Sequence, residues 1–151
     1  MNQFMKAALE YADRGWRVFP VKPKHKAPPL ISDWPNKTTT DPEQIKRWWH
    51  HWPSANVAIA TGGGLIVVDI DFGRGGAHSI RGLGEKHQIP TTPTVKTPGP
   101  GCHLYFQNIG AEMGNKENLL PGLDLRGAGG YVIAPPSVHP NGGIYIWSIK
   151  P

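Results

Sequence analysis

The fold of this chain is decided by one stretch, LIVVDID at residues 65–71, an apolar run that ends in two carboxylates. Its length and its β-branched residues predict a buried strand. Because side chains alternate along a strand, Asp69 and Asp71 should project from the same face, about 7 Å apart. Two carboxylates this close repel each other and are costly to desolvate, whereas Mg²⁺ or Mn²⁺ would relieve both problems. The stretch therefore indicates either a metal site or two solvated acids at a strand end.

Short apolar runs on both sides of this stretch predict the remaining elements. We expect helices at residues 2–14, 40–52 and 77–87, and further strands at residues 16–21, 56–60, 94–97, 103–108, 123–125, 131–134 and 143–147. Grouped strands of this kind predict an α+β fold with a mixed or antiparallel sheet. A Rossmann-type fold is less expected, because crossover helices do not separate the strands regularly.

Two places in the sequence carry local signals, one for the start of a helix and one for a tight turn. Thr40 is the expected N-cap of the second helix, with Glu43 closing a capping box and Pro53 ending the helix. The segment TGGG at residues 61–64 predicts a tight turn, so the strands on either side of it should pair as a hairpin.

Composition limits the class of protein. The chain has 151 residues, of which 38% are hydrophobic and 18% charged, so residues 1–151 should form one globular domain. The single cysteine, Cys102, excludes an internal disulfide framework and a cysteine-rich zinc site. Without a signal peptide or an apolar run of about 18 residues, we expect a soluble, cytoplasmic protein with no membrane contact. The net charge of +5 favours a polyanionic partner such as nucleic acid or a nucleotide.

A third acid lies in LDLRG at residues 123–127. The apolar neighbours predict a short strand in which Asp124 points away from the two leucines. Alone, Asp124 would be a turn or capping residue. Beside the first two acids, it would complete a set of three carboxylates that can hold two metal ions about 3.5–4 Å apart for phosphoryl transfer. Arg126 shares its face and is either a phosphate ligand or part of a surface salt bridge.

A histidine begins the apolar strand after the turn GPG at residues 99–101. His103 is either a partly exposed structural residue or a phosphate ligand, because the preceding glycines let the backbone approach a ligand closely. Lys96 and Thr97, just before the turn, would add a positive charge and a hydroxyl group.

Two further groups of residues have both a structural and a nucleic-acid interpretation. The tryptophans of residues 48–52 follow helical spacing, which indicates packing of that helix on the sheet, although one exposed ring would be able to stack on a base. The three lysines of residues 22–26 lie in a proline-rich loop, where they are either solvated or in contact with a nucleic-acid backbone.

Taken together, five motifs resemble the prim-pol domain of bifunctional DNA primase-polymerases, within the archaeo-eukaryotic primase superfamily. They are GWRVFPV at residues 15–21, WP at 52–53 with NVAIATG at 56–62, VVDID at 67–71, KTP at 96–98 with GCHLYF at 101–106, and GLDLRGAGGYVIAPPS at 122–137. The resemblance covers nearly the whole chain, from about Ala7 to Trp147.

The resemblance implies an RRM-like catalytic core joined to a second small α/β unit. It also implies that Asp69, Asp71 and Asp124 are catalytic residues that bind the metal ions, and that His103 contacts the phosphates of the incoming nucleotide. The family's histidine belongs to a Ser-x-His motif, and Gly101 stands where the serine would be. A hydroxyl contact must therefore come from elsewhere or be absent. Some members carry a zinc-binding insertion, but this chain lacks the cysteines for one, so no zinc is expected.

The leading hypothesis is a template-dependent nucleotidyltransferase (EC 2.7.7), a DNA primase/polymerase of phage, plasmid or mobile-element replication. It would use two Mg²⁺ or Mn²⁺ ions, with Lys96, Thr97 and Arg126 joining His103 in nucleotide binding. Its partners would be a single-stranded DNA template or primer, a dNTP or NTP, and, as a further candidate, a replicative helicase. Many members carry a helicase and a helical segment after this domain; neither is expected here, so nucleotide transfer is more expected than primer initiation.

Two rival hypotheses use the same residues. The chain is alternatively a non-catalytic module that binds single-stranded DNA or nucleotide for a larger replication protein, which the missing serine favours. A metal-dependent nuclease is the third hypothesis.

Overall fold

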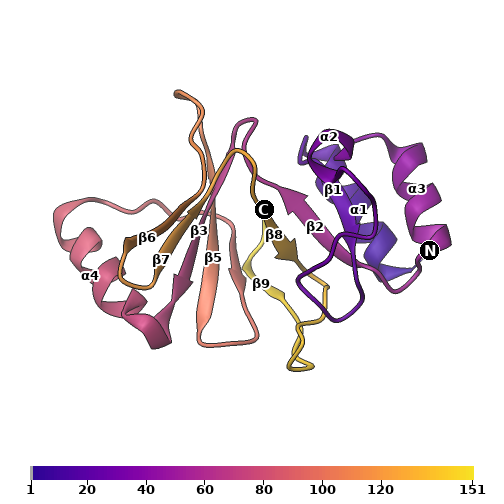
Figure 1. The fold of residues 1–151 in the computed structure, drawn as a ribbon. Helices are drawn as coiled ribbons and strands as arrows, with labels where there is room; N and C mark the ends of the chain where they lie inside the picture. Colours follow the sequence, from indigo (N-terminus) through magenta and orange to yellow (C-terminus); the bar gives the residue numbers. More distant parts are fainter. Residues whose placement is uncertain (1) are drawn as a thin grey trace. The chain divides into compact units, whose positions relative to one another are not determined.

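The computed structural model describes residues 2–151, which form four α-helices and nine strands (Figure 1). The strands make two antiparallel sheets, one of three strands and one of six, so the fold is α+β and its sheets are not mixed. The chain divides into two compact units. The first runs up to Ala60 and includes Tyr131–Ile146, and the second comprises Thr61–Gly130 and Trp147–Pro151.

The first unit contains the smaller sheet, whose strand order is β1-β2-β8. Its elements are α1 (Gln3–Asp13), β1 (Val18–Val21), α2 (Trp34–Lys37), α3 (Pro42–His51), β2 (Asn56–Ala60) and β8 (Tyr131–Ala134). Helices α1 and α3 pack on each other and on the sheet. Trp48 and Trp49 of α3 are buried, and the indole of Trp49 donates a hydrogen bond to the carbonyl of Ala55. The packing interpretation of these two tryptophans is therefore confirmed.

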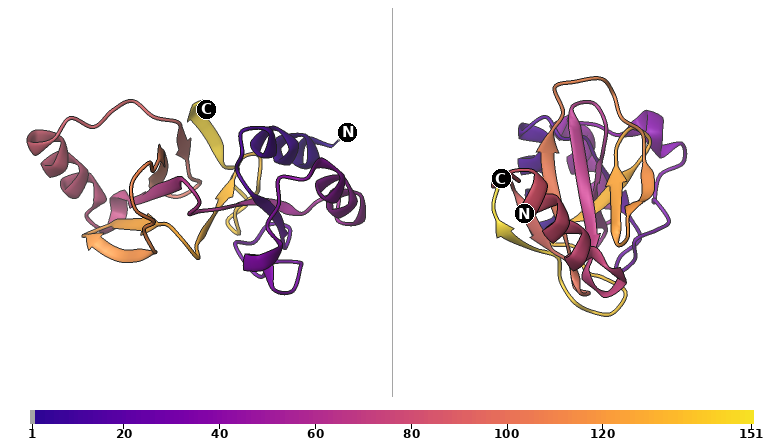
Figure 2. Two further views of the ribbon diagram at one scale, coloured as in Figure 1. Left: turned by 90° about the horizontal axis from the view of Figure 1, so that it is seen from above. Right: turned by 90° about the vertical axis from the view of Figure 1, so that its left-hand side faces the viewer.

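The second unit contains the larger sheet, whose strand order is β6-β7-β3-β5-β4-β9. Its elements are β3 (Leu65–Asp71), the 3₁₀ helix η1 (Phe72–Arg74), α4 (Gly76–Lys86), β4 (Thr94–Lys96), β5 (Gly101–Gln107), β6 (Lys116–Leu120), β7 (Leu123–Arg126) and β9 (Ile146–Ile149). Helix α4 lies beside β3 and β7 (Figure 2). A Cβ atom on Gly76 would lie 2.8 Å from Cγ2 of Ile70, so glycine allows the helix to begin this close to β3.

The prediction that residues 56–60 and 65–71 pair as a hairpin is wrong. β2 pairs with β1 and β8, whereas β3 pairs with β5 and β7. Both edges of each strand are therefore occupied, and the two strands belong to different sheets. The glycines between them, Gly62, Gly63 and Gly64, all have positive φ, so they redirect the chain from one sheet to the other.

Other boundaries differ from expectation for local reasons. Asp41, and not Thr40, is the N-cap of α3, because Pro42 occupies the first helical turn and requires an extended residue before it. The Asp41 carboxylate accepts a hydrogen bond from the Glu43 amide. Helix α2 and strand β6 were not expected from the sequence, and the last strand is Ile146–Ile149 instead of the expected 143–147.

Among residues 2–151, no helix combines the length and the apolar character that crossing a bilayer would require.

One buried amide connects three segments of the first unit. Asn56 in β2 is fully buried, and its Nδ2 donates to the carbonyls of His25 and Val138 at 2.9 and 2.8 Å. Its Oδ1 accepts from the amide of Val138 at 3.0 Å. Asn56 therefore fastens the loop after β1 and the segment after β8 to the central strand.

We expect Asn56→Ala to lower the free energy of unfolding by about 3 kcal/mol, because it leaves buried backbone groups without partners. The measurement is urea unfolding followed by tryptophan fluorescence. Asn36→Ala is the matched control, because the amide of Asn36 is exposed and bonds only to Asp33, and we expect a loss below about 0.5 kcal/mol. Equal losses in the two variants would contradict the connecting role of Asn56.

Candidate active site

Three polar side chains lie in one row across the larger sheet. Asp69 in β3 pairs with His103 in β5 on one side and with Asp124 in β7 on the other. Directly paired residues of antiparallel strands project from the same face, so the three side chains are neighbours. The structure therefore brings together residues that lie far apart in the sequence, as required for a shared site.

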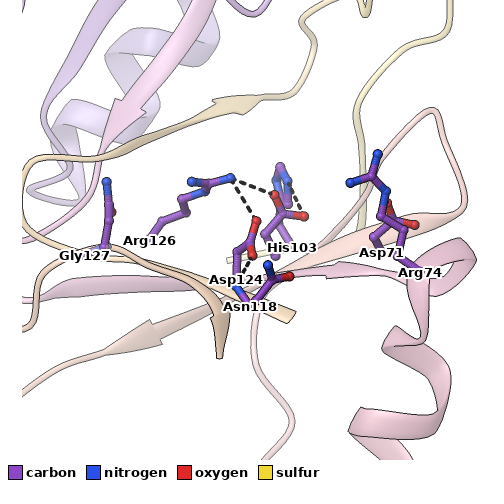
Figure 3. Close-up of polar contacts among 9 residues, drawn as sticks. Asp71, Arg74, His103, Asn118, Asp124, Arg126 and Gly127 are labelled. Carbon is purple, nitrogen blue, oxygen red and sulfur yellow. Dashed lines mark hydrogen bonds and ion pairs between the residues drawn. The ribbon is translucent and has the colours of Figure 1, made fainter. Parts of the chain in front are cut away.

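Arg126 supplies the positive charge of this row (Figure 3). Its Nη2 lies 3.3 Å from Oδ2 of Asp124 and 3.6 Å from Oδ2 of Asp69, so one nitrogen contacts both carboxylates. On the other side, Nε2 of His103 lies 3.6 Å from Oδ1 of Asp69, which makes an ion pair when the imidazole is protonated. His103 is 7% exposed and the side chains of both acids are 31% exposed, so water screens these charges only in part.

Asp71 has separate partners beyond the row. Its Oδ1 accepts a hydrogen bond from the amide of Gly73 at 2.9 Å, and its Oδ2 lies 3.6 Å from Nε of Arg74. Figure 3 shows Asp71 and Arg74 together, away from Asp124 and Arg126. In the part of the chain that the structure describes, no group of three or more His, Cys, Asp or Glu side chains is arranged to hold a metal ion.

Lys96 lies on the other face of the sheet. It pairs with Cys102, whereas Val95 before it pairs with His103. Because side chains alternate, the register places Lys96 opposite to the face that carries His103. The structure therefore does not bring Lys96 beside the acids.

Thr97, by contrast, lies against the strand end that carries Asp71. Its amide donates to the carbonyl of Gly101 at 3.3 Å, and Gly101 pairs with Asp71. A Cβ atom on Gly101 would lie only 3.2 Å from Oγ1 of Thr97. The threonine hydroxyl thus lies beside the position where a side chain at residue 101 would begin.

Asp124 has a further contact that the sequence does not predict. The backbone amide of Asn118 in β6 donates to Oδ1 of Asp124 at 2.8 Å. Asn118 has φ of 49°, a left-handed conformation that asparagine tolerates better than most residues. Because the donor is a backbone group in an exposed strand without hydrophobic alternation, no side-chain pattern marks this contact.

The donor set of the row fits a hard divalent cation. Two half-buried carboxylates directly opposite each other are destabilising unless a positive charge lies between them, and Arg126 supplies one such charge. Mg²⁺ commonly binds one or two carboxylates and completes its coordination with water and substrate phosphates. Asp69 and Asp124 meet this requirement, and Asp71 lies at the end of the same strand.

The pKa of Cys102, which lies on the opposite face of the sheet, depends on the charge of this row. Burial of the thiol raises the pKa of Cys102, and the negative charge of Asp69 raises it further. The thiolate is the reactive form, so at a given pH this cysteine should react more slowly than an exposed one.

We expect the pH profile for alkylation of Cys102 by iodoacetamide to lie at higher pH than that of an exposed thiol. Asp69→Asn removes one negative charge, so its profile should move back toward lower pH while the contribution of burial remains. Asp71→Asn is the control and should leave the profile in place. Equal shifts in both variants would show that the thiol senses net charge instead of Asp69.

We expect Gly101→Ala to destabilise the protein by about 2 kcal/mol or more, because its Cβ atom would lie 2.3 Å from the backbone oxygen of Ile70. The clash would separate β5 from β3 at the end that carries Asp71. Gly99→Ala is the control, since nothing lies within 4 Å of its Cβ position. Thermal unfolding measures both, and a Gly101 variant as stable as the Gly99 variant would contradict this register.

Comparison with models of protein families identifies the family to which this chain belongs. The model of a protein family described as "Bifunctional DNA primase/polymerase, N-terminal" (Prim-Pol) matches residues 8–151. No match was found among curated proteins. The matched region contains both sheets and every residue of the row formed by His103, Asp69 and Asp124. The chain therefore belongs to the Prim-Pol family of bifunctional DNA primase/polymerase N-terminal domains.

Proposed function

We propose that this protein is a template-dependent nucleotidyltransferase that extends a DNA primer. Family membership implies primase/polymerase activity on DNA and nucleotide substrates, and such polymerases are generally metal-dependent. The observation that carries the finer proposal is the placement of Asp69 directly opposite Asp124, with Arg126 and His103 in contact with the same carboxylates. Acids that would hold a metal and cations that would bind phosphates therefore share one face of the sheet.

Asp69 and Asp124 would hold Mg²⁺ or Mn²⁺, with Asp71 joining a two-metal arrangement by exchanging its contact with Arg74. Since that contact is a 3.6 Å ion pair with an arginine that is 84% exposed, its loss would cost little free energy. When bound, the ions would activate the primer 3′-hydroxyl and stabilise the charge of the leaving pyrophosphate.

His103 and Arg126 would bind the triphosphate. The Arg126 guanidinium contacts two carboxylates, and its forked donors also suit phosphate oxygens. His103 is fixed by burial in a central strand and directs Nε2 toward Asp69, so it would present a donor beside the metal ligands. Both residues stabilise negative charge without themselves reacting.

Thr97 would supply the hydroxyl that Gly101 cannot. Oγ1 of Thr97 lies next to the Cβ position of Gly101, which stands where the family's serine is expected. Lys96 would add positive charge near this end of the sheet without joining the row, because its register places it on the other face.

The proposal also covers the domain, the substrates and the replication partner of this protein. Residues 1–151 would form one catalytic domain with an RRM-like core in the larger sheet, acting in phage, plasmid or mobile-element replication. Single-stranded template, primer and dNTP or NTP would be its substrates, and a replicative helicase a further partner.

The test is extension of a labelled primer on a single-stranded template with Mg²⁺ or Mn²⁺. We expect extension by the wild type and a loss of about 100-fold or more in Asp69→Asn and Asp124→Asn, because each removes a metal ligand. Glu85→Gln is the matched control, since it removes one acid from α4 on the opposite side of β3, and it should extend normally.

Three other outcomes would contradict the proposal. DNA binding without extension by any variant would indicate a non-catalytic module. Degradation of labelled DNA without added nucleotide would indicate a nuclease. Normal extension by a folded Asp69→Asn variant would show that the reaction does not depend on this row.

A further inference from the structure

The net charge of the chain is unevenly divided between the two units. The first unit contains nine Lys and Arg residues against five Asp and Glu, whereas the second contains seven against six. Within the first unit, residues 17–37 contain five of the cations and a single acid, and the rest of the unit contains four of each. The whole positive excess of the first unit therefore comes from one segment around the loop after β1.

The centre of this segment is the basic loop, which we define as residues 22–26. Its lysines, Lys22, Lys24 and Lys26, are all exposed. None of the salt bridges found among residues 2–151 involves them. Exposed cationic side chains that form no salt bridge create a positive potential at the surface. Such a potential favours a polyanionic ligand.

The backbone of the basic loop is held in place from both ends. The amide of Lys22 donates to the carbonyl of Pro28 at 3.0 Å, and the His25 amide donates to the carbonyl of Lys22 at 3.1 Å. The buried amide of Asn56 binds the carbonyl of His25, and the hydroxyl of Tyr131 donates to the carbonyl of Lys26 at 2.8 Å. The loop is therefore ordered before any ligand binds, which lowers the entropic cost of binding.

Aromatic rings adjoin the basic loop. The ring of Trp34 stacks on that of Phe19 with centroids 4.6 Å apart, and Tyr131 packs edge-on against both at 5.1 Å. Phe19 is buried, but Trp34 and Tyr131 are only partly buried. Aromatic side chains next to backbone-binding cations are typical of proteins that bind single-stranded nucleic acid.

The positive potential extends to a second segment of the same unit. Burial lowers the pKa of His139, and the charge of Lys26 lowers it further. The segment after β8 thus lies within the field of the basic loop.

We propose that the basic loop of the first unit is a binding surface for the phosphate backbone of single-stranded DNA. Its three lysines would contact successive phosphates, and the partly exposed rings of Trp34 and Tyr131 would lie beside the bases. This binding would need neither a metal ion nor a nucleotide. The identity of the polyanion as DNA rests on the proposed polymerase function, but the surface itself is argued from charge, order and aromatic neighbours.

The experiment measures binding of a fluorescein-labelled 20-mer of deoxythymidylate to the full chain, without metal or dNTP, over a series of salt concentrations. We expect Lys22→Gln/Lys24→Gln/Lys26→Gln to reduce the slope of log affinity against log salt by about 2, since each phosphate contact on a single strand contributes about 0.7. At low salt its affinity should fall about 10-fold or more. The arginine triple variant at the same positions should retain the wild-type slope.

The matched control is Lys86→Gln/Lys116→Gln/Lys150→Gln, which removes three lysines from the second unit and gives the same net charge. We expect it to keep the wild-type slope. Equal losses in the two glutamine triple variants would show a general charge effect and overturn the proposal, as would wild-type binding by the basic-loop variant. The same dependence on the basic loop with a duplex of equal length would overturn the assignment to a single strand.

These results are distinguishable from failure of the proposed function. Primer extension tests the acids of the second unit, whereas oligonucleotide binding without metal tests the lysines of the first. If the wild type binds DNA through the basic loop but extends no primer, the polymerase proposal fails and the binding surface stands.

Discussion

The site depends on an unfavourable pair, Asp69 and Asp124, which face each other directly across adjacent strands. Two like charges in this position destabilise a sheet, and partial burial increases the repulsion. The surrounding residues offset it with a guanidinium that contacts both carboxylates, an imidazole beside one, and a backbone amide on the other. The pair therefore requires positive charge beside it, and Arg126 supplies one such charge.

The topology of the larger sheet makes this pair rigid. β3 has a partner on both edges and begins after a glycine turn that separates it from β2. The paired strands β5 and β7 bring His103 and Asp124 to the level of Asp69, although Asp124 lies 55 positions further along the sequence. Helix α4 lies against the face that carries Ile70, which leaves the polar row on the other face. The site is therefore defined by strand register, and a shift of one residue would remove it.

The sequence predicted most elements of this fold because their signals are local. Alternation in LIVVDID, the apolar stripe of the first helix and the short run at 131–134 each determine a type of structure without reference to the rest of the chain. The pairing of strands is not local, which explains the incorrect hairpin: TGGG resembles a hairpin turn, but both flanking strands obtain better partners elsewhere. The exposed strand β6 lacks any hydrophobic pattern and escaped prediction for that reason.

The candidate site likewise depends on strand pairing, which local sequence signals do not determine. Residue types that suit phosphoryl transfer can be recognised in the sequence, but only the strand register shows that Asp69, His103 and Asp124 are neighbours. Arg126 contacts both acids. Alternation alone gave Asp71 the face of Asp69, but it did not predict the contacts of Asp71 with Gly73 and Arg74, which arise from the 3₁₀ turn that follows. Lys96 lies close to His103 in sequence, yet alternation in β4 places it on the opposite face.

The division of charge between the units fits the two tasks proposed for them. The second unit is almost balanced, with seven cations against six acids, and one of these cations, Arg126, contacts both acids of the row. The first unit holds four of the five excess positive charges, so a polyanion would be attracted mainly by this unit. Under both proposals, the lysines of the first unit would bind the DNA backbone, and the acids of the second unit would bind the metal ions that nucleotide transfer requires.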